Sequence, residues 1–408
     1  MKQILIILFI LTLWTCKQEY KIENKIQEDV AFLSDDKLEG RATGTDGEKA
    51  AATYIAKRFK SLGLKEKGTN GYFQDFTFKP KTQPHAEVKY TSINSDSTIT
   101  GRNIVGFMDN KAERTVVIGA HYDHLGYGNE GSLYREKEKA IHNGADDNAS
   151  GVALMLNIAS RLKETNTGNN YLFMAFSGEE MGLLGSNYFA KNPTISTEEI
   201  NFMINMDMVG RLKADSTLAV YGVGTSPIFK QVISSSNNSF KIIENESGVG
   251  PSDHTSFYLV DIPVLHFFTG QHEDYHKPSD DAEKLNYEGM DKISDYIFDI
   301  ITDLDDNGEL AFRKTKNESE ETPRFKVGLG VIPDYMFDGK GMRIDGVSED
   351  KPAIKAGLKK GDIVIQLGDS TVVDMMSYMR ALSVFEKGSK TKVIVERDGK
   401  RVEAELEF

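Results

Sequence analysis

Between residues 115 and 268 the chain repeats one pattern, a short apolar run with few charges that leads into polar or helical sequence. Helical spacing is clear in residues 152–162, which lie between two of these runs. Buried strands that alternate with helices indicate an α/β fold, in which a largely parallel, twisted sheet is covered by helices on both faces. The apolar runs are residues 116–120, 171–176, 200–206, 218–223 and 262–268.

The chain before this pattern has other periods. Residues 26–33 read as a short helix, and Thr45 with Glu48 forms a capping box before a second helix, which Gly63 closes. Residues 71–101 alternate apolar and polar side chains, as edge strands of an antiparallel part do. We therefore expect antiparallel strands beside the parallel ones.

Polar side chains stand directly after three of the apolar runs. His121 follows the first run, Glu179 and Glu180 follow the second, and Asp207 follows the third. Sites in such sheets form beyond the carboxyl ends of the strands, so we expect these side chains to lie near one another. Imidazole and carboxylate groups are ligands that hold zinc. The sequence therefore predicts a zinc site at this edge of the sheet.

Two further segments carry groups of the same kind. Residues 143–151 read NGADDNASG, which places Asp146 and Asp147 between glycines and just before a helical stretch. Residues 275–280 read YHKPSD and supply His276. The other three motifs are HYD at residues 121–123, SGEE at 177–180 and NMD at 205–207.

In this order the five motifs resemble those of metallopeptidase family twenty-eight, typified by secreted bacterial aminopeptidases with two zinc ions. The resemblance covers roughly residues 25–305. It implies the zinc exopeptidase fold, a phosphorylase/hydrolase-like architecture, and removal of N-terminal residues from peptide substrates. Such hydrolysis needs a strong nucleophile and a stabilised oxyanion, and two zinc ions about 3.5–4 Å apart supply both.

The resemblance also implies a role for each matching residue. Asp146 would bridge the two zinc ions, while Glu179 would stay off the metals as the general base. Asp123 would orient an imidazole, and Asp280 is a candidate for similar support near the last motif. In the family the bond between the paired acids, here Asp146–Asp147, is cis, and Asp147 has a supporting place. The remaining ligands would be His121 and Asp207 on one ion, and Glu180 and His276 on the other.

Other histidines compete for these roles. His272 precedes His276 by four residues, but Pro278 and Asp280 favour His276. His124 directly follows the first metal motif, and both support of the ligands and a purely local role are compatible with that place.

The first 16 residues resemble the signal peptide of a bacterial lipoprotein. Lys2 supplies a positive start, residues 4–14 are apolar, and Cys16 follows at the place of lipidation. An apolar run of 11 residues is too short to span a bilayer. We expect export to the periplasm or cell envelope with a lipid anchor as the only membrane attachment, the alternative being an ordinary cleaved signal. Since Cys16 is the only cysteine, the mature chain can form no internal disulfide.

The net charge of −13 excludes one class of partner. Residues 325–408 contain equal numbers of basic and acidic side chains, so the acidic excess lies in residues 1–324. A chain this acidic is a poor candidate for binding nucleic acid through charge, and no nucleic-acid partner is expected.

The C-terminal residues 325–408 resemble a PDZ domain and follow a polar linker at residues 306–324, which leaves residues 22–305 for the peptidase domain. Residues 346–364 match the central signature of bacterial PDZ domains. Such domains add an extended peptide to a sheet edge, so peptide C-termini or a protein partner are expected ligands. Simple packing against the peptidase domain is the alternative. The expected carboxylate-binding loop consists of Gly328, Leu329, Gly330 and Val331.

The sequence thus favours an exported zinc aminopeptidase that acts on peptides. A carboxypeptidase, a dipeptidase and a glutaminyl cyclase with a single zinc ion are alternatives on the same fold. The full set of five ligands argues against the single-zinc alternative. A non-catalytic scaffold centred on the PDZ domain is an alternative of another class, but a scaffold would be free to lose ligands, and none is missing.

Overall fold

The computed structural model describes residues 25–80, 88–95, 97–128, 131–163, 165, 168–315, 326–334, 336–337, 339–348 and 351–408. The predicted signal peptide, with Cys16, lies outside the described residues, as do residues 316–325. In the part of the chain that is described, no helix is both long and apolar enough to cross a bilayer.

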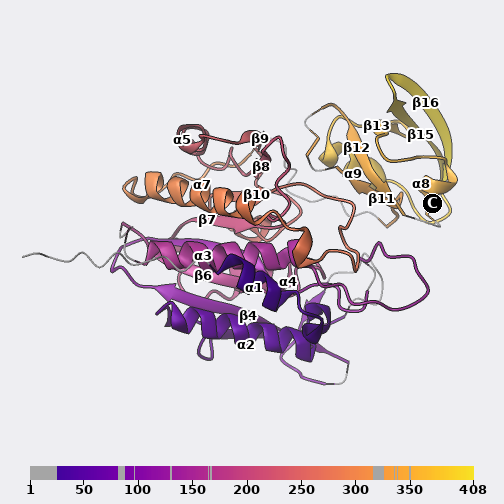
Figure 1. Cartoon of the computed structure of the whole chain (residues 1–408). Helices are drawn as coiled ribbons and strands as arrows, with labels where there is room; N and C mark the ends of the chain where they lie inside the picture. Colours follow the sequence, from indigo (N-terminus) through magenta and orange to yellow (C-terminus); the bar gives the residue numbers. More distant parts are fainter. Residues whose placement is uncertain are drawn as a thin grey trace, which may run out of the picture.

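A large sheet forms the centre of the N-terminal domain (Figure 1). Its strand order is β3-β2-β4-β6-β5-β7-β10-β8-β9, and β1 pairs with β4. The strands are β1 (Lys65–Glu66), β2 (Phe73–Lys79), β3 (Lys89–Tyr90), β4 (Ile99–Met108), β5 (Thr115–His121), β6 (Asn170–Phe176), β7 (Ile200–Met206), β8 (Thr217–Tyr221), β9 (Lys241–Asn245) and β10 (Val264–Phe268).

The sheet is mixed, with a parallel centre. Adjacent strands β6, β5, β7 and β10 run parallel to one another. Their outer neighbours β4 and β8 run antiparallel to them. The α/β class and the antiparallel strands among residues 71–101 are confirmed. The largely parallel arrangement holds for the inner strands only, because β8 reverses direction beside β10.

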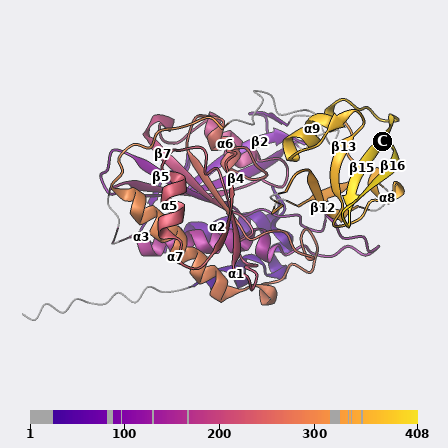
Figure 2. The same cartoon turned by 90° about the horizontal axis from the view of Figure 1, so that it is seen from above.

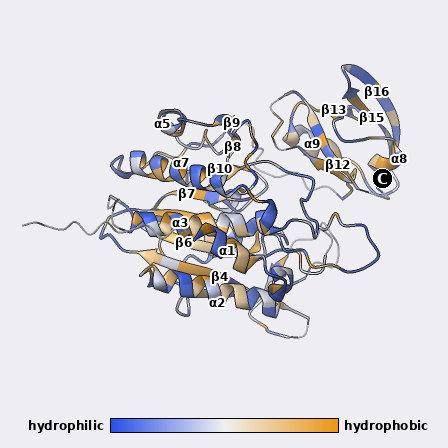
Figure 3. Cartoon of the chain, viewed as in Figure 1, coloured by the Kyte–Doolittle hydropathy of each residue, from blue (hydrophilic) through white to orange (hydrophobic). Residues whose placement is uncertain are grey.

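Both faces of the parallel strands are covered, which explains why their sequences are mostly apolar and contain no lysine, arginine, aspartate or glutamate. In β5, Val116 and Ile118 contribute to the core on one face, and Val117 to the core on the other. Figure 2 shows the helices on the two faces of the sheet, and Figure 3 shows the hydrophobic residues along α3. The first face carries α1 (Ile26–Leu33), α2 (Asp46–Ser61), α3 (Gly151–Leu162), α5 (Phe229–Ser236) and α7 (Tyr287–Asp305), and the second carries α4 (Leu184–Lys191) and α6 (His254–Tyr258).

The predicted helices near the N-terminus are confirmed, but the capping box is only half formed. The Thr45 side chain accepts the Glu48 N–H, as predicted. The Glu48 carboxylate does not return to the Thr45 N–H; it is buried and accepts hydrogen bonds from the Gly44 N–H and the Ser177 hydroxyl. Burial raises the pKa of Glu48 to about 8. This glutamate therefore ties the start of α2 to the segment that follows β6.

The C-terminal domain has its own sheet and its own core. The strand order is β11-β12-β13-β15-β16, with β14 beside β13. Leu329, Ile344 and Val395 are among its buried residues. Figures 1 and 2 both show this domain to one side of the larger one. Its elements are β11 (Val331–Pro333), β12 (Met342–Val347), α8 (Pro352–Lys355), β13 (Ile363–Leu367), β14 (Ser370–Thr371), α9 (Met375–Ser383), β15 (Lys390–Arg397) and β16 (Lys400–Glu407).

The first part of the predicted linker is packed on the N-terminal domain. Leu310 is 7% exposed and belongs to the main core, while Phe312 packs on the core of the second face. The Arg313 N–H donates to the Thr225 carbonyl at 2.8 Å. The predicted polar linker of residues 306–324 therefore begins with a segment, residues 310–313, that is attached to the N-terminal domain.

Candidate metal centre

The ends of three parallel strands bring the predicted ligands together. The register pairs His121 with Phe176, so the SGEE segment begins beside His121. Asp207 directly follows β7. Opposite these strand ends lies the acid loop, a helical turn η2 (Ala145–Ser150) that leads into α3. The carboxyl ends of β5, β6 and β7 thus face this loop, as expected for an α/β sheet.

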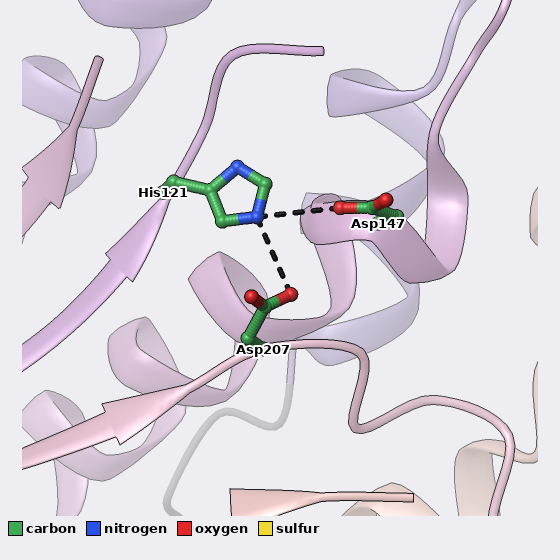
Figure 4. A group of neighbouring side chains, drawn as sticks. All are labelled: His121, Asp147 and Asp207. Atoms are coloured by element: carbon green, nitrogen blue, oxygen red, sulfur yellow. Dashed lines mark hydrogen bonds and ion pairs between the residues drawn. The ribbon is translucent and has the colours of Figure 1, made fainter. Parts of the chain in front are cut away.

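Asp147 is the residue on which the histidines converge. His121 Nε2 lies 3.3 Å from Asp147 Oδ1 and 3.3 Å from Asp207 Oδ1, and Figure 4 shows these three side chains pointing toward one another. The other carboxylate oxygen of Asp147 lies 3.2 Å from His276 Nε2. His276 Nε2 is also 3.3 Å from Glu180 Oε2. Asp147 therefore stands between two groups of ligand-type atoms.

Asp146 does not occupy this place, although it was expected to bridge the metals. Its Oδ1 accepts the Gly210 N–H at 2.6 Å, and its Oδ2 lies 3.1 Å from His272 Nε2. The cis bond is likewise one residue later than expected, between Asp147 and Asn148 rather than between Asp146 and Asp147. Because the loop turns between the two acids, Asp146 faces its own supporting contacts and Asp147 faces the histidines. Of the two acids, Asp147 therefore lies where the two groups of possible ligands meet, and Asp146 lies outside them.

The two glutamates of the SGEE segment have different surroundings. Glu180 faces His276, whereas Glu179 Oε2 comes no nearer to an imidazole than 4.0 Å, at His121 Nε2. Burial, together with the negative charges of Asp207 and Glu180, raises the pKa of Glu179 well above its usual range. Glu179 is thus a carboxylate beside the ligand groups but outside their closest contacts, which is the position that a general base needs.

The two expected supporting aspartates differ in what they contact. The Asp123 carboxylate lies beside the imidazole that it was expected to orient, with Oδ1 at 3.7 Å from His121 Nδ1. Asp123 accepts the Glu179 N–H at 3.1 Å, and the hydrogen-bond partner of His121 Nδ1 is the Asp123 main-chain carbonyl at 3.2 Å. Asp280 was expected near His276, but it accepts the N–H groups of Asp146 and Asp147 at 3.0 and 3.1 Å. Asp280 therefore holds the acid loop in place rather than orienting His276.

His124 is a candidate ligand that the sequence left undecided. Its Nδ1 lies 2.7 Å from Glu180 Oε1 and 3.9 Å from Asp147 Oδ2. In the described part of the chain, neither His124 Nδ1 nor Glu180 Oε1 has a hydrogen-bond partner, although both are buried. Their separation of 2.7 Å is a hydrogen-bond distance and is shorter than the roughly 3.3–3.5 Å between two ligand atoms on one zinc ion, so this contact suits an imidazole that supports the Glu180 carboxylate. The only signal in the sequence was its place three residues after His121.

The residues present fit zinc. The structure brings two groups of possible metal ligands together, His121–Asp147–Asp207 and His124–Asp147–Glu180, with Asp147 in both. Two ligand atoms on one tetrahedral zinc ion with bonds of about 2.0–2.2 Å are separated by roughly 3.3–3.5 Å. The observed separations of 3.3 Å around His121 and of 3.2 and 3.3 Å around His276 match this value.

The charge of the site also favours a cation. Burial lowers the pKa of His276, but the carboxylates of Glu180 and Asp147 outweigh that effect and raise the pKa well above its usual range. His121 behaves in the same way, with Asp207 and Glu179 as the main opposing charges. The buried carboxylates therefore need positive charge, which either protons on the imidazoles or metal ions can supply.

Arg41 fixes the loops on which the site is built, and sequence reasoning passed over it as part of a loop. Its buried guanidinium donates to the carbonyls of Tyr122, Asn143 and Gly144, at 2.7, 2.6 and 3.0 Å, and also to the Leu33 carbonyl. It thus joins α1, the segment after β5 and the acid loop.

We expect Arg41→Met to lower the free energy of unfolding by about 3 kcal/mol or more. The substitution leaves several buried carbonyls without a donor, and each costs about 1–3 kcal/mol. Urea denaturation of the full chain measures the loss. The matched control is Arg102→Met, since Arg102 pairs with Asp75 at the surface and such pairs contribute about 0–1 kcal/mol. Equal losses for the two variants would contradict the role given to Arg41.

The predicted carboxylate-binding loop of the C-terminal domain lies at the start of β11. Leu329 is fully buried, and its carbonyl accepts the Ala353 N–H. Gly330 has a φ of +74° and accepts the Ser348 N–H. Binding of a carboxylate by Gly328 to Val331 stays a prediction.

Comparison with known proteins agrees with this geometry. Residues 103–301 match the family described as Peptidase family M28, and residues 310–408 match the PDZ domain. The chain contains an M28 peptidase domain. The expected family and the expected C-terminal PDZ domain are therefore confirmed, and the N-terminal domain is of the metallopeptidase type.

Two curated relatives illustrate the similarity of the M28 domain. Aminopeptidase YwaD of Bacillus subtilis is 28% identical over 214 residues, covering 48% of this chain and 43% of the relative. The alkaline phosphatase isozyme conversion protein of Escherichia coli is 29% identical over 187 residues, covering 46% of this chain and 51% of the relative. The chain thus spans about half the length of the curated relatives it matches.

Solved structures share the fold at low sequence identity. An aminopeptidase from Aneurinibacillus sp. strain AM-1 aligns with a TM-score of 0.54 and 19% identity, over 74% of this chain and 97% of that one. Glutaminyl cyclase from Porphyromonas gingivalis aligns with a TM-score of 0.53 and 19% identity, over 68% of this chain and 97% of that one. The zinc exopeptidase fold is therefore confirmed, and it is shared by enzymes with different reactions.

Proposed function

We propose that this protein is an exported aminopeptidase that binds two zinc ions and removes N-terminal residues from peptides. One observation carries the proposal: Asp147 stands in both groups of possible metal ligands, and the free carboxylate of Glu179 lies beside them. The names of relatives such as Aminopeptidase YwaD support the choice among the reactions of this fold. A single-zinc glutaminyl cyclase would not need a carboxylate shared by two ligand groups.

The ligand roles follow from the contacts of each side chain. His121 and Asp207 would hold one ion, Glu180 and His276 would hold the other, and Asp147 would hold both. His124 Nδ1, at 2.7 Å from Glu180 Oε1, would add to the second ion or fix the Glu180 carboxylate.

When bound, zinc ions lower the pKa of a bound water and polarise the peptide carbonyl. Glu179 would accept a proton from the attacking water and pass it to the leaving amine, a role that is supported by its place beside the ligand groups, at 4.0 Å from His121 Nε2. The pocket beside these groups is also lined by Met208, Phe268 and Tyr275. These apolar side chains would contact the side chain of the N-terminal residue and exclude water from it.

The proposal predicts two zinc ions per chain and activity that depends on them. Chelator treatment should abolish hydrolysis of an amino-acid amide, and added zinc should restore it. Elemental analysis gives the zinc content, and a panel of free and N-blocked peptides tests the reaction. Hydrolysis of N-blocked peptides would favour a carboxypeptidase, and active protein without bound metal would contradict the zinc chemistry.

The same zinc titration should depend on pH. In the metal-free protein the pKa values of His121 and His276 lie well above their usual range, so these imidazoles carry protons at neutral pH. Since only the neutral imidazole binds zinc, binding should release protons, and the affinity should fall as the pH is lowered. Calorimetry in buffers with different ionisation enthalpies counts the released protons, and a count of zero at pH 7 would contradict the assignment.

Export and lipid anchoring at Cys16 are part of the proposal, supported by the apolar run and the position of the cysteine. Replacement of Cys16 by Ser should release the protein from the membrane fraction. Unchanged membrane association of the variant would contradict a lipid anchor at this residue.

A further inference from the structure

A cavity of about 360 Å³ lies between the M28 domain and the PDZ domain. The M28 side supplies Arg135, Tyr275 and Lys277, and the PDZ side supplies Ile332 from the edge strand β11 and Lys360. Neither domain alone encloses this space. The cavity is distinct from the small pocket at the metal centre, and the two linings have only Tyr275 in common.

Tyr275 connects the two spaces. Its side chain lines both the metal-centre pocket and the interdomain cavity. Its ring stacks on His276, with 3.8 Å between the ring centroids. The main-chain carbonyl of the same histidine accepts the Leu133 N–H at 3.0 Å, and Leu133 also lines the cavity. The cavity therefore begins one side chain away from the proposed zinc ligands.

The PDZ domain contacts the rim of the metal centre directly. Met336, in the segment after β11, packs on an apolar cluster that includes Met208 and Phe268, and both of these residues line the metal-centre pocket. At Gly270 a Cβ atom would lie 3.0 Å from Met336 Cγ, so the main chain of the M28 domain passes close beneath this methionine. This contact places the segment after β11 against two residues that line the metal-centre pocket.

The walls of the cavity suit the end of a peptide chain. Lys360 is neutralised by Asp345, at 2.9 Å. Arg135 and Lys277 donate hydrogen bonds to main-chain carbonyls, those of Ser132 and Glu273 respectively. The carboxylate of Glu273 adds one negative charge to the lining, so an excess of one positive charge remains.

A pair of strands forms part of the PDZ side of the cavity. Ile332 of β11 lines it together with Asp345, Gly346 and Val347 of β12, the strand with which β11 pairs. The apolar side chains of Ile332 and Val347 can contact the side chains of a bound peptide.

We propose that this cavity binds the part of a short peptide substrate that follows the scissile bond, with its C-terminal carboxylate facing Arg135 and Lys277. The inference rests on the proposed peptidase function, because it places the N-terminus of the same peptide at the metal centre. The PDZ domain is then a wall of the substrate site, and the enzyme selects short peptides with a free C-terminus.

Steady-state kinetics of the full chain tests this with two tripeptides, Leu-Gly-Gly and its C-terminal amide. The wild type should have a KM for the amide that is roughly tenfold higher, the size of one lost charge-assisted contact. Arg135→Gln should raise the KM of the free peptide and bring the ratio close to one. Lys355→Gln, an exposed residue on α8 outside the cavity, should keep the wild-type ratio. An equal KM for the two peptides in the wild type, or an unchanged ratio in Arg135→Gln, would overturn the proposal.

Calorimetric binding of the same two peptides to full-length Glu179→Gln separates this inference from the proposed function. If the wild type hydrolyses neither peptide, the peptidase function fails, but preferential binding of the free peptide still supports the cavity. If peptides are hydrolysed and neither Arg135→Gln nor C-terminal amidation changes their binding, the cavity proposal fails alone.

Discussion

Replacing Glu179 by Gln is expected to lower kcat by ~10²–10⁴, the usual size of a general-base contribution, while both zinc ions stay bound. Glutamine keeps the shape of the side chain but loses the basic oxygen. Glu179 Oε2 lies 4.0 Å from His121 Nε2, farther than the contacts of 3.2 and 3.3 Å that surround the other imidazole, at His276. KM should change little, because the groups that would hold the metals and the substrate are untouched.

Glu180→Gln is the matched variant, because the substitution is the same and the residue is adjacent. Glu180 faces His276 at 3.3 Å and His124 at 2.7 Å. Loss of its charge should therefore weaken one zinc site, and added zinc should partly restore the activity. Zinc titration with steady-state kinetics on both variants distinguishes the roles. Loss of zinc from Glu179→Gln with full occupancy in Glu180→Gln would reverse them, and unchanged activity in both would contradict the mechanism.

The inner strands could be predicted because strands that are buried on both faces consist mainly of apolar residues. Val116, Val117 and Ile118 all lie in the core, and no acidic or basic side chain separates them. The reversed direction of β8 could not be predicted, since a strand buried on both faces has the same composition in either direction. Leu310 and Phe312 show the same limit, because a few apolar residues in a polar segment do not reveal where they pack.

The site could be predicted as a set of residues but not as a set of contacts. The strand-end positions of His121, Glu179, Glu180 and Asp207 follow from the α/β pattern. The choice between Asp146 and Asp147 depends on which way a single turn of the acid loop faces, and adjacent identical side chains do not encode that. The role of His124 depends on how the segment after β5 folds back, with the His124 N–H donating to the Arg41 carbonyl.

Separate substitution of Asp146 and Asp147 should change the zinc content and kcat/KM to very different extents, although the two residues are adjacent. Asp147→Asn removes the carboxylate that faces His121 at 3.3 Å and His276 at 3.2 Å. An amide offers one neutral oxygen in place of two charged ones, so both ligand groups are weakened at once. We expect the zinc content to fall below one ion per chain and kcat/KM to fall by more than the ~10–100-fold that loss of a supporting residue costs.

Asp146→Asn serves as the control one residue away, because it removes the same charge from a supporting position. The amide oxygen of the new side chain can still accept the Gly210 N–H that Asp146 Oδ1 accepts at 2.6 Å, while the contact with His272 is weakened. We expect both zinc ions to stay bound and kcat/KM to fall by ~10–100-fold at most. Zinc analysis and kinetics on the two variants decide between the acids. If Asp146→Asn loses both ions while Asp147→Asn retains them, Asp146 is the bridging ligand, and the arrangement of the acid loop described above is wrong.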